Sequence, residues 1–193
     1  MNLILIGPQG SGKGTQAEKL VVELGLTHIE MGALIRERAE KHDRKAEIID
    51  HLVNKKGQLL PDGIVLDMID DELDERPTDK GYLFDGFPRT VAQYQALKEM
   101  LKQRDLTLSV GLYLAISHEE SVKRLKNRGR VDDTPEAIGC RLDLFQQNTQ
   151  PILKIMKAEG ILVEINGEQA PEAIFKEVKE KLANAQGPEV RTK

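Results

Sequence analysis

The sequence predicts an α/β protein in which five parallel strands lie between two layers of helices. Five short apolar runs are rich in branched residues, as expected of strands that are buried on both faces. Between these runs, apolar residues recur at helical spacing. The chain has 193 residues, enough for one domain with a substantial core.

The predicted strands and helices alternate along the chain. Apolar runs predict five strands, at residues 2–6, 27–30, 81–85, 108–116 and 161–165. The pattern at 27–30 gives the weakest of these predictions. Apolar residues three or four positions apart predict helices at residues 13–24, 31–56, 90–103, 118–127, 134–158 and 171–185. A further helix is predicted to begin at about residue 61. The helix near residue 61 has a clear start, because Pro61 and Asp62 both favour a first helical turn. A helix between successive strands allows those strands to run parallel.

Composition excludes several classes of partner. The 28 basic and 32 acidic residues give a net charge of −4, which provides no broad basic surface for nucleic acid. No run approaches the ~18 apolar residues of a membrane helix. The single cysteine, Cys140, rules out an internal disulfide and a cysteine-based zinc site. We therefore expect a cytoplasmic protein without nucleic-acid or membrane partners. Cys140 itself is predicted to fill a small space in the core.

The glycine-rich segment "GPQGSGK" follows the first strand and opens the first helix. It fits the pattern G-x-x-x-x-G-K from Gly7 to Lys13, for which this strand–loop–helix context is the required one. Glycines let successive N–H groups point into one concavity, the helix N-terminus adds positive potential, and Lys13 adds a mobile charge. A tight turn that only closes the corner is the alternative, but seven constrained positions favour a loop that wraps polyphosphate. Gly14 separates Lys13 from Thr15, so this loop is less suited to holding Mg²⁺ directly.

A second dense motif, "LFDGFPRT", ends the third strand. Asp85 closes this strand, and its carboxylate could orient Mg²⁺ through water if the strand lies beside the first one. The sharp turn that follows aims Arg89 over the carboxyl ends of the strands, where open α/β sheets bind their ligands. The alternatives are a turn cap for Asp85 and a surface ion pair for Arg89.

Four motifs occur in the order found in adenylate kinases: "GPQGSGKGTQ", "GQLLPD", "DGFPRT" followed by Gln93, and "GRVDD" followed by "RL". The chain therefore resembles the nucleoside monophosphate kinase family over residues 1–183, in a form with a short lid. The resemblance implies a three-layer fold of the P-loop NTPase type, with one domain over 1–185. It also implies a helical lobe for the monophosphate at 30–60 and a very short lid at 125–135. Residues 186–193 contain glycine, proline and charges without apolar spacing, which predicts a flexible tail.

The resemblance further implies reversible phosphoryl transfer from Mg-ATP to AMP, giving two molecules of ADP, by a monomeric enzyme without zinc. The residues implied for ATP are Gly10, Ser11, Gly12, Lys13, Gly14, Thr15, Arg124, Arg128 and Gln169. Those implied for AMP are Met31, Arg36, Gln58, Leu59, Leu60, Gly86, Phe87, Pro88, Arg89, Gln93, Arg130 and Arg141. The implied catalytic set is Lys13, Asp85, Arg89, Arg128, Arg130 and Arg141, with Mg²⁺ held by ATP and water near Asp85.

The segment "HIEMGALIRE" departs from the family pattern. Relatives usually carry a Ser or Thr pair before the glycine and Asp after it, where this chain has Glu30, Met31 and Ala33. Met31 cannot hydrogen-bond as a hydroxyl does. Glu30 brings negative charge near an anionic ligand unless it points away or pairs with an arginine. Gln93 still favours AMP over pyrimidine monophosphates, so we expect AMP as the acceptor with relaxed selectivity. A kinase for UMP or CMP is the alternative function.

Two other functions have less support. A GTPase switch needs N-K-x-D to read guanine, and the nearest match, "NKKG" at 54–57, lacks the aspartate. A catalytically silent protein that only binds nucleotides would not need all the lysine and arginine side chains of the implied catalytic set.

Local patterns also predict the geometry around the lid. Arg124 and Arg128 are four residues apart and therefore share a helix face. Asp133 and Glu136 fit a capping box for the following helix. Arg141 borders the apolar stripe of that helix, which favours a role in the site. The four histidines show no metal-ligand pairing.

Overall fold

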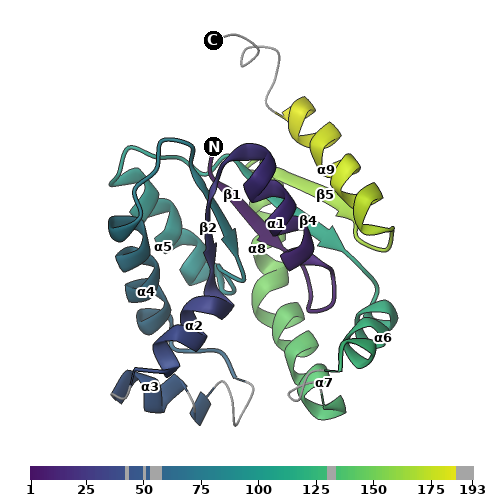
Figure 1. Cartoon of the computed structure of the whole chain (residues 1–193), viewed down its shortest axis with the longest axis horizontal. Coiled ribbons are helices and arrows are strands. Elements are labelled where there is room, and N and C mark those ends of the chain that lie inside the picture. Colours follow the sequence, from purple (N-terminus) through teal and green to yellow (C-terminus); the bar gives the residue numbers. More distant parts are fainter. Residues whose placement is uncertain (42–43, 50, 53–57, 130–133, 186–193) are drawn as a thin grey trace.

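The computed structural model describes residues 1–41, 44–49, 51–52, 58–129 and 134–185 (Figure 1). Its strands are β1 (Leu3–Ile6), β2 (Thr27–Glu30), β3 (Tyr82–Asp85), β4 (Val110–Ala115) and β5 (Leu162–Asn166). Its helices are α1 (Lys13–Leu24), α2 (Met31–Ala39), α3 (Arg44–Ile49), α4 (Asp62–Glu75), α5 (Val91–Lys102), α6 (His118–Arg128), α7 (Pro135–Leu144), α8 (Gln150–Ala158) and α9 (Pro171–Ala185). A π-helical turn, η2 (Phe145–Thr149), joins α7 to α8.

The strands form one parallel sheet in the order β2-β3-β1-β4-β5, which confirms the predicted fold class. From β1 the chain winds outward to β2 and back to β3, and then crosses to β4 and β5 on the other side. The chain therefore reverses its direction along the sheet at β2. Because β1 and β3 are parallel neighbours, the loops that follow them emerge side by side. The register pairs Leu5 with Asp85, so the end of β3 lies next to the end of β1.

Helices cover both faces of the sheet, and the side chains of β1 alternate between them (Figure 1). Leu3 and Leu5 pack on one face with apolar residues of α1 and α9. Ile4 and Ile6 pack on the other face with residues of α4, α5 and α8. This arrangement explains the continuous apolar run in the sequence, because both faces of the strand are buried.

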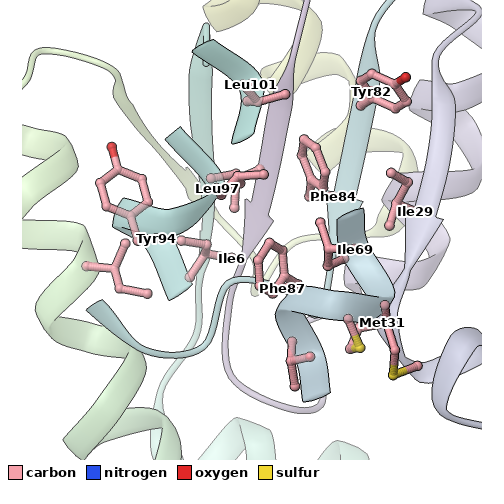
Figure 2. Packing of buried hydrophobic residues seen from close by; sticks show 14 of the residues in the cluster. Ile6, Ile29, Met31, Ile69, Tyr82, Phe84, Phe87, Tyr94, Leu97 and Leu101 are labelled. Atoms are coloured by element: carbon pink, nitrogen blue, oxygen red, sulfur yellow. The ribbon is translucent and has the colours of Figure 1, made fainter. Parts of the chain in front are cut away.

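Aromatic rings support the turn after β3. The ring centroids of Tyr82 and Phe84 lie 5.9 Å apart, and those of Phe84 and Phe87 lie 6.3 Å apart (Figure 2). All three side chains are almost fully buried. Packed rings of this kind hold a loop firmly, so the turn that carries Arg89 rests on a rigid base.

Three local predictions were wrong. The helix expected over 31–56 is divided, because α2 ends at Ala39 and α3 begins at Arg44. The cap of α7 is Thr134 and not Asp133: Pro135 takes the first helical position, so the hydroxyl of Thr134 accepts from the backbone N–H of Ala137 at 3.2 Å. Cys140 is exposed instead of filling the core, because it lies on the opposite side of α7 from the buried residue Ile138.

Other boundaries moved by small amounts. The helix expected over 134–158 is interrupted by the π-helical turn, and the strand expected at 108–116 is confined to Val110–Ala115. Among the described helices, none combines the length and apolarity needed to cross a membrane. The tail at 186–193 and Asp133 lie outside the described residues.

Candidate functional site

A cavity of about 1080 Å³ opens at the carboxyl ends of β1 and β3. Most of the residues that the sequence predicts for the site line this cavity. They are Gly10, Gly12, Lys13, Gly14, Thr15, Met31, Arg36, Gln58, Leu59, Leu60, Asp85, Gly86, Phe87, Pro88, Arg89, Gln93, Arg124, Arg128 and Arg141. Ser11 belongs to the glycine loop but is fully buried and does not line the cavity. Gln169 is also absent from the lining, and Arg130 lies outside the described residues. The motifs therefore converge on one space, although they are far apart in the sequence.

The glycine loop enters α1 through residues with left-handed backbone angles. Gly10 has φ of 85° and Gly12, the N-cap of α1, has φ of 89°. Gly12 has no side chain with which to cap the helix, and the first turn of α1 contains no acidic residue. The unsatisfied N–H groups of this helix end therefore lack a competing anion of their own, which suits them to bind phosphate.

Lys13 folds back over the loop that precedes it. Its Nζ donates to the carbonyl oxygens of Gly7 at 2.7 Å and Pro8 at 3.0 Å. The pKa of Lys13 is lowered to about 8, mainly by burial. The charge of Asp85 opposes this shift, and the charges of Arg89 and Arg128 contribute to it. An anion in the loop would offset both effects, so Lys13 is poised for a negatively charged ligand.

Asp85 lies at the boundary between the sheet and the cavity. Its side chain is largely buried, and burial raises the pKa of this carboxyl, while Lys13 and His28 oppose that rise. Nε2 of His28 is 3.9 Å from Oδ2 of Asp85. Among the described residues, no group of three or more His, Cys, Asp or Glu side chains could hold a metal ion. Magnesium keeps water ligands and binds through one or two carboxylates plus phosphate, so Asp85 fits a magnesium–nucleotide complex.

Arg89 is held by its own turn and by η2. Its Nε donates to the carbonyl oxygen of Gly86 at 2.8 Å, and Thr149 Oγ1 donates to the carbonyl oxygen of Arg89 at 2.9 Å. Burial lowers the pKa of Arg89, Asp85 opposes this, and the charge of Arg141 lowers it further. Arg89 and Arg141 therefore lie close enough to repel each other. Such a pair of cations in one cavity calls for a multiply charged anion between them.

A model of the adenylate kinase family matches residues 5–161 of this chain. The chain belongs to the adenylate kinase family. It is 40% identical over 188 residues to the adenylate kinase of Parabacteroides distasonis, covering 95% of this chain and 98% of that relative. It is 38% identical over 182 residues to that of Phocaeicola vulgatus, covering 92% and 96% of the two chains. It is 37% identical over 167 residues to that of Mycobacterium ulcerans, covering 86% and 92%.

The segment that departs from the family pattern forms the far side of the cavity. Oε1 of Glu30 is 3.1 Å from Nη2 of Arg36, so the unusual carboxylate pairs with an arginine. Met31 is 2% exposed and packs with the core cluster around Ile29 and Phe87 (Figure 2). The thioether therefore supplies an apolar wall where family members place a hydroxyl.

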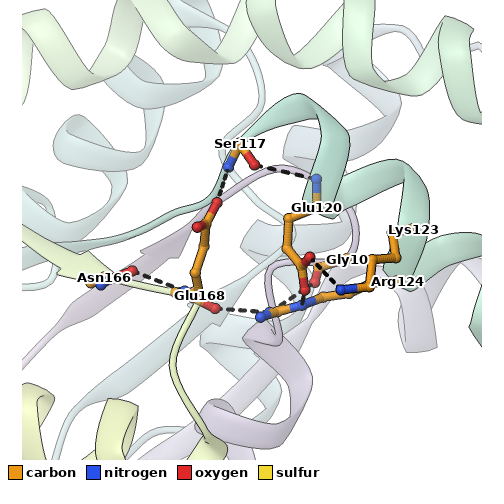
Figure 3. A network of polar contacts seen from close by, with 8 residues as sticks. Gly10, Ser117, Glu120, Lys123, Arg124, Asn166 and Glu168 are labelled. Carbon is orange, nitrogen blue, oxygen red and sulfur yellow. Dashed lines mark hydrogen bonds and ion pairs between the residues drawn. The ribbon is translucent and has the colours of Figure 1, made fainter.

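Arg124 connects three segments around the part of the cavity that is predicted to bind ATP (Figure 3). Its Nε donates to Oε1 of Glu120 at 2.8 Å, and its Nη1 donates to the carbonyl oxygen of Gly167 at 2.8 Å. The same Nη1 lies 3.5 Å from the carbonyl oxygen of Gly10. Arg124 thereby joins α6, the glycine loop and the loop before α9.

Gln169 lies in this last loop, but its side chain turns toward α9. Its Nε2 donates to Oε2 of Glu177 at 2.5 Å and to the carbonyl oxygen of Asn166 at 3.2 Å. The side chain is therefore occupied within the loop, and any contact of Gln169 with a nucleotide is left to its main chain.

Sequence reasoning did not identify some residues that shape the cavity. Thr149 lines it and supports Arg89, and Asp62 binds the side chain of Gln93. Asp62 belongs to the motif "GQLLPD", which predicts a helix start and a likeness to the family but does not indicate a contact with Gln93. The partners of these residues are distant in the chain, so no local pattern indicates the contacts.

Proposed function

We propose that the protein transfers the terminal phosphoryl group of Mg-ATP reversibly to AMP, giving two molecules of ADP. One observation carries this proposal: Lys13, Arg89, Arg128 and Arg141 line one cavity with the glycine loop. Two polyanions could not share such a space without several fixed cations. Membership in the adenylate kinase family and the likeness to curated adenylate kinases favour this reaction over the alternatives.

The residues have distinct tasks in this proposal. An oxygen of the AMP phosphate attacks the γ-phosphorus of ATP. The bond from that phosphorus to the bridging oxygen breaks, so ADP leaves and the new P–O–P bond makes the second ADP. The glycine loop and Lys13 hold the ATP phosphates, Arg36 and Arg89 hold the AMP phosphate, and the remaining arginines surround the transferring group. Catalysis then consists mainly of positioning and charge neutralisation.

Magnesium is the cofactor in this proposal, and it would neutralise charge on the β- and γ-phosphates. Asp85 would orient the ion through water ligands. The family relationship and the burial of Asp85 beside the glycine loop support this role. Removal of the Asp85 carboxylate therefore provides a direct test of magnesium dependence.

Closure of two parts of the chain, each of which includes residues outside the described ranges, would exclude water from the reacting groups. The helical lobe at 30–60 would close over AMP, and the short lid at 125–135 would close over ATP. Since water competes as a phosphoryl acceptor, closure limits hydrolysis of ATP. The family relationship supports a monomer, and the single cysteine suits a reducing cytoplasm. Equilibrium sedimentation tests the monomeric state.

A coupled assay of ADP formation tests the function. Purified protein is supplied with Mg-ATP and one of AMP, CMP, UMP or GMP, and Lys13→Ala serves as the inactive control. We expect AMP to be the preferred acceptor, with activity lost in the variant. A marked preference for UMP or CMP refutes AMP as the substrate. If the protein turned over none of the monophosphates, the result would instead support a catalytically silent nucleotide-binding protein.

A further inference from the structure

We propose that Asp62 is a positioning residue for Gln93 and that it sets the preference of the acceptor pocket for adenine. This inference rests on the proposed function, because it assumes that AMP binds beside Gln93. Asp62 is the first residue of α4 and lies two positions after Leu60, which lines the cavity together with Leu59.

The side-chain amide of Gln93 is fixed at both ends. Its Nε2 donates to Oδ1 of Asp62 at 2.7 Å, and its Oε1 accepts from the backbone N–H of Arg89 at 2.7 Å. The two partners have opposite hydrogen-bonding character, since a carboxylate only accepts and a backbone N–H only donates. An inverted amide would place oxygen against oxygen and N–H against N–H. Only one orientation of Gln93 therefore satisfies the structure.

Asp62 is itself held in place. The hydroxyl of Thr90 donates to Asp62 and lies 3.2 Å from Oδ2, and it also accepts from the backbone N–H of Gln93 at 3.1 Å. The N-terminal position of Asp62 on α4 further stabilises its negative charge. Asp62, Thr90 and Gln93 thus form a closed network that joins the start of α4 to the start of α5.

A fixed amide can distinguish purines by the polarity of their edges. Gln93 is 2% exposed, lines the cavity, and retains one N–H and one oxygen lone pair beyond the contacts described above. Adenine presents an exocyclic amine as donor beside a ring nitrogen as acceptor, which a correctly oriented amide matches bidentately. Hypoxanthine presents a carbonyl acceptor beside an N–H donor, which is the reverse. An amide free to invert accepts either base, whereas the amide held by Asp62 favours adenine.

The test compares AMP with IMP, whose bases differ in this polarity. We would measure kcat/KM for both acceptors and KM for ATP in wild type, Asp62→Ala, Asp62→Asn and Asp62→Glu. Asp62→Ala should lower the ratio of AMP to IMP efficiency by about ten-fold, the order expected for a hydrogen bond to a charged group, with KM for ATP unchanged. Asp62→Asn should largely restore the ratio, because its amide oxygen can still accept from Gln93. Asp71→Ala, an exposed change on the same helix, serves as the matched control.

A double variant separates positioning from a general structural effect. If Asp62 acts through Gln93, then Asp62→Ala should not change the selectivity of a Gln93→Ala protein any further. Equal losses with AMP and IMP, or an unchanged ratio, would overturn the inference. Should Asp62→Ala fail to fold, Asp62→Glu decides, since it keeps the charge at the helix end but displaces the oxygens. Absence of AMP turnover in wild type would refute the proposed function itself, which is a separate result.

Discussion

The carboxylate of Glu30 lies 3.1 Å from the guanidinium of Arg36, at the edge of the cavity where the proposed monophosphate binds. Both side chains are substantially exposed, at 41% and 65%. An incoming phosphate must therefore compete with Glu30 for Arg36. The chain carries its own counter-ion at a position where the family pattern has a neutral hydroxyl, and this difference is open to direct measurement.

Removal of this charge should strengthen AMP binding. Exposed ion pairs contribute at most about 1 kcal/mol, so Glu30→Gln should lower KM for AMP by roughly two- to five-fold and leave kcat nearly unchanged. Steady-state kinetics with varied AMP checks this expectation. Glu37→Gln, an exposed change on α2, is the matched control. An increase in KM for AMP would mean that Glu30 helps to bind the acceptor.

The charge of Lys13 should control the pH dependence of the reaction with ATP. The pKa of Lys13 is lowered to about 8, so the free enzyme loses this positive charge as pH rises through that value. Hence kcat/KM for ATP should be constant below the pKa and fall above it, because this parameter reports the free enzyme. Lys13→Arg should have lower activity without that decline, since arginine keeps its charge. A profile that stays flat to about pH 10, where ordinary lysines titrate, contradicts this assignment.

Asp85 should govern the requirement for magnesium. Asp85→Asn removes the charge that the proposed metal complex needs, so kcat should fall by about 10²-fold and half-saturation by Mg²⁺ should move to higher concentration. Binding of ATP in EDTA should not weaken, because the lost carboxylate repels phosphate. Titration calorimetry and kinetics at varied Mg²⁺ measure both effects. Asp79→Asn provides an exposed control before β3, and an unaltered magnesium requirement in Asp85→Asn would count against the metal role.

The sequence indicated the sheet and the glycine loop because each depends on local chemistry. The run at 2–6 is apolar at every position, and β1 is buried on both faces. The motif from Gly7 to Lys13 combines several backbone constraints within seven residues, which leaves few alternatives. The sequence does not indicate the break after Ala39, because apolar residues at helical spacing occur on both sides of it. The segment is mostly polar, so its few apolar positions cannot locate such a break.

The paired side chains of the site could not be predicted in the same way. Asp62 and Gln93 are 31 positions apart, and their contact depends on how α4 and α5 pack. Thr149 meets Arg89 across 60 positions, through a π-helical turn that no pattern indicated. The sequence shows the conflict between Glu30 and an anionic ligand, and it leaves open whether Glu30 points away or pairs with an arginine. Only the structure identifies Arg36 as that partner.

Arg124 should affect ATP without affecting AMP. Its guanidinium links Glu120 on α6 to the carbonyl oxygen of Gly167, which lies in the loop where the proposed ATP adenine binds (Figure 3). Arg124→Ala removes two hydrogen bonds from a charged donor, so KM for ATP should rise by about ten-fold or more. KM for AMP should be unchanged, because the acceptor residues lie across the cavity. Lys126→Ala, an exposed change on α6, controls for loss of charge alone. If KM rises equally for both nucleotides, Arg124 supports the fold and not the ATP side, because its contacts join α6 to the glycine loop as well.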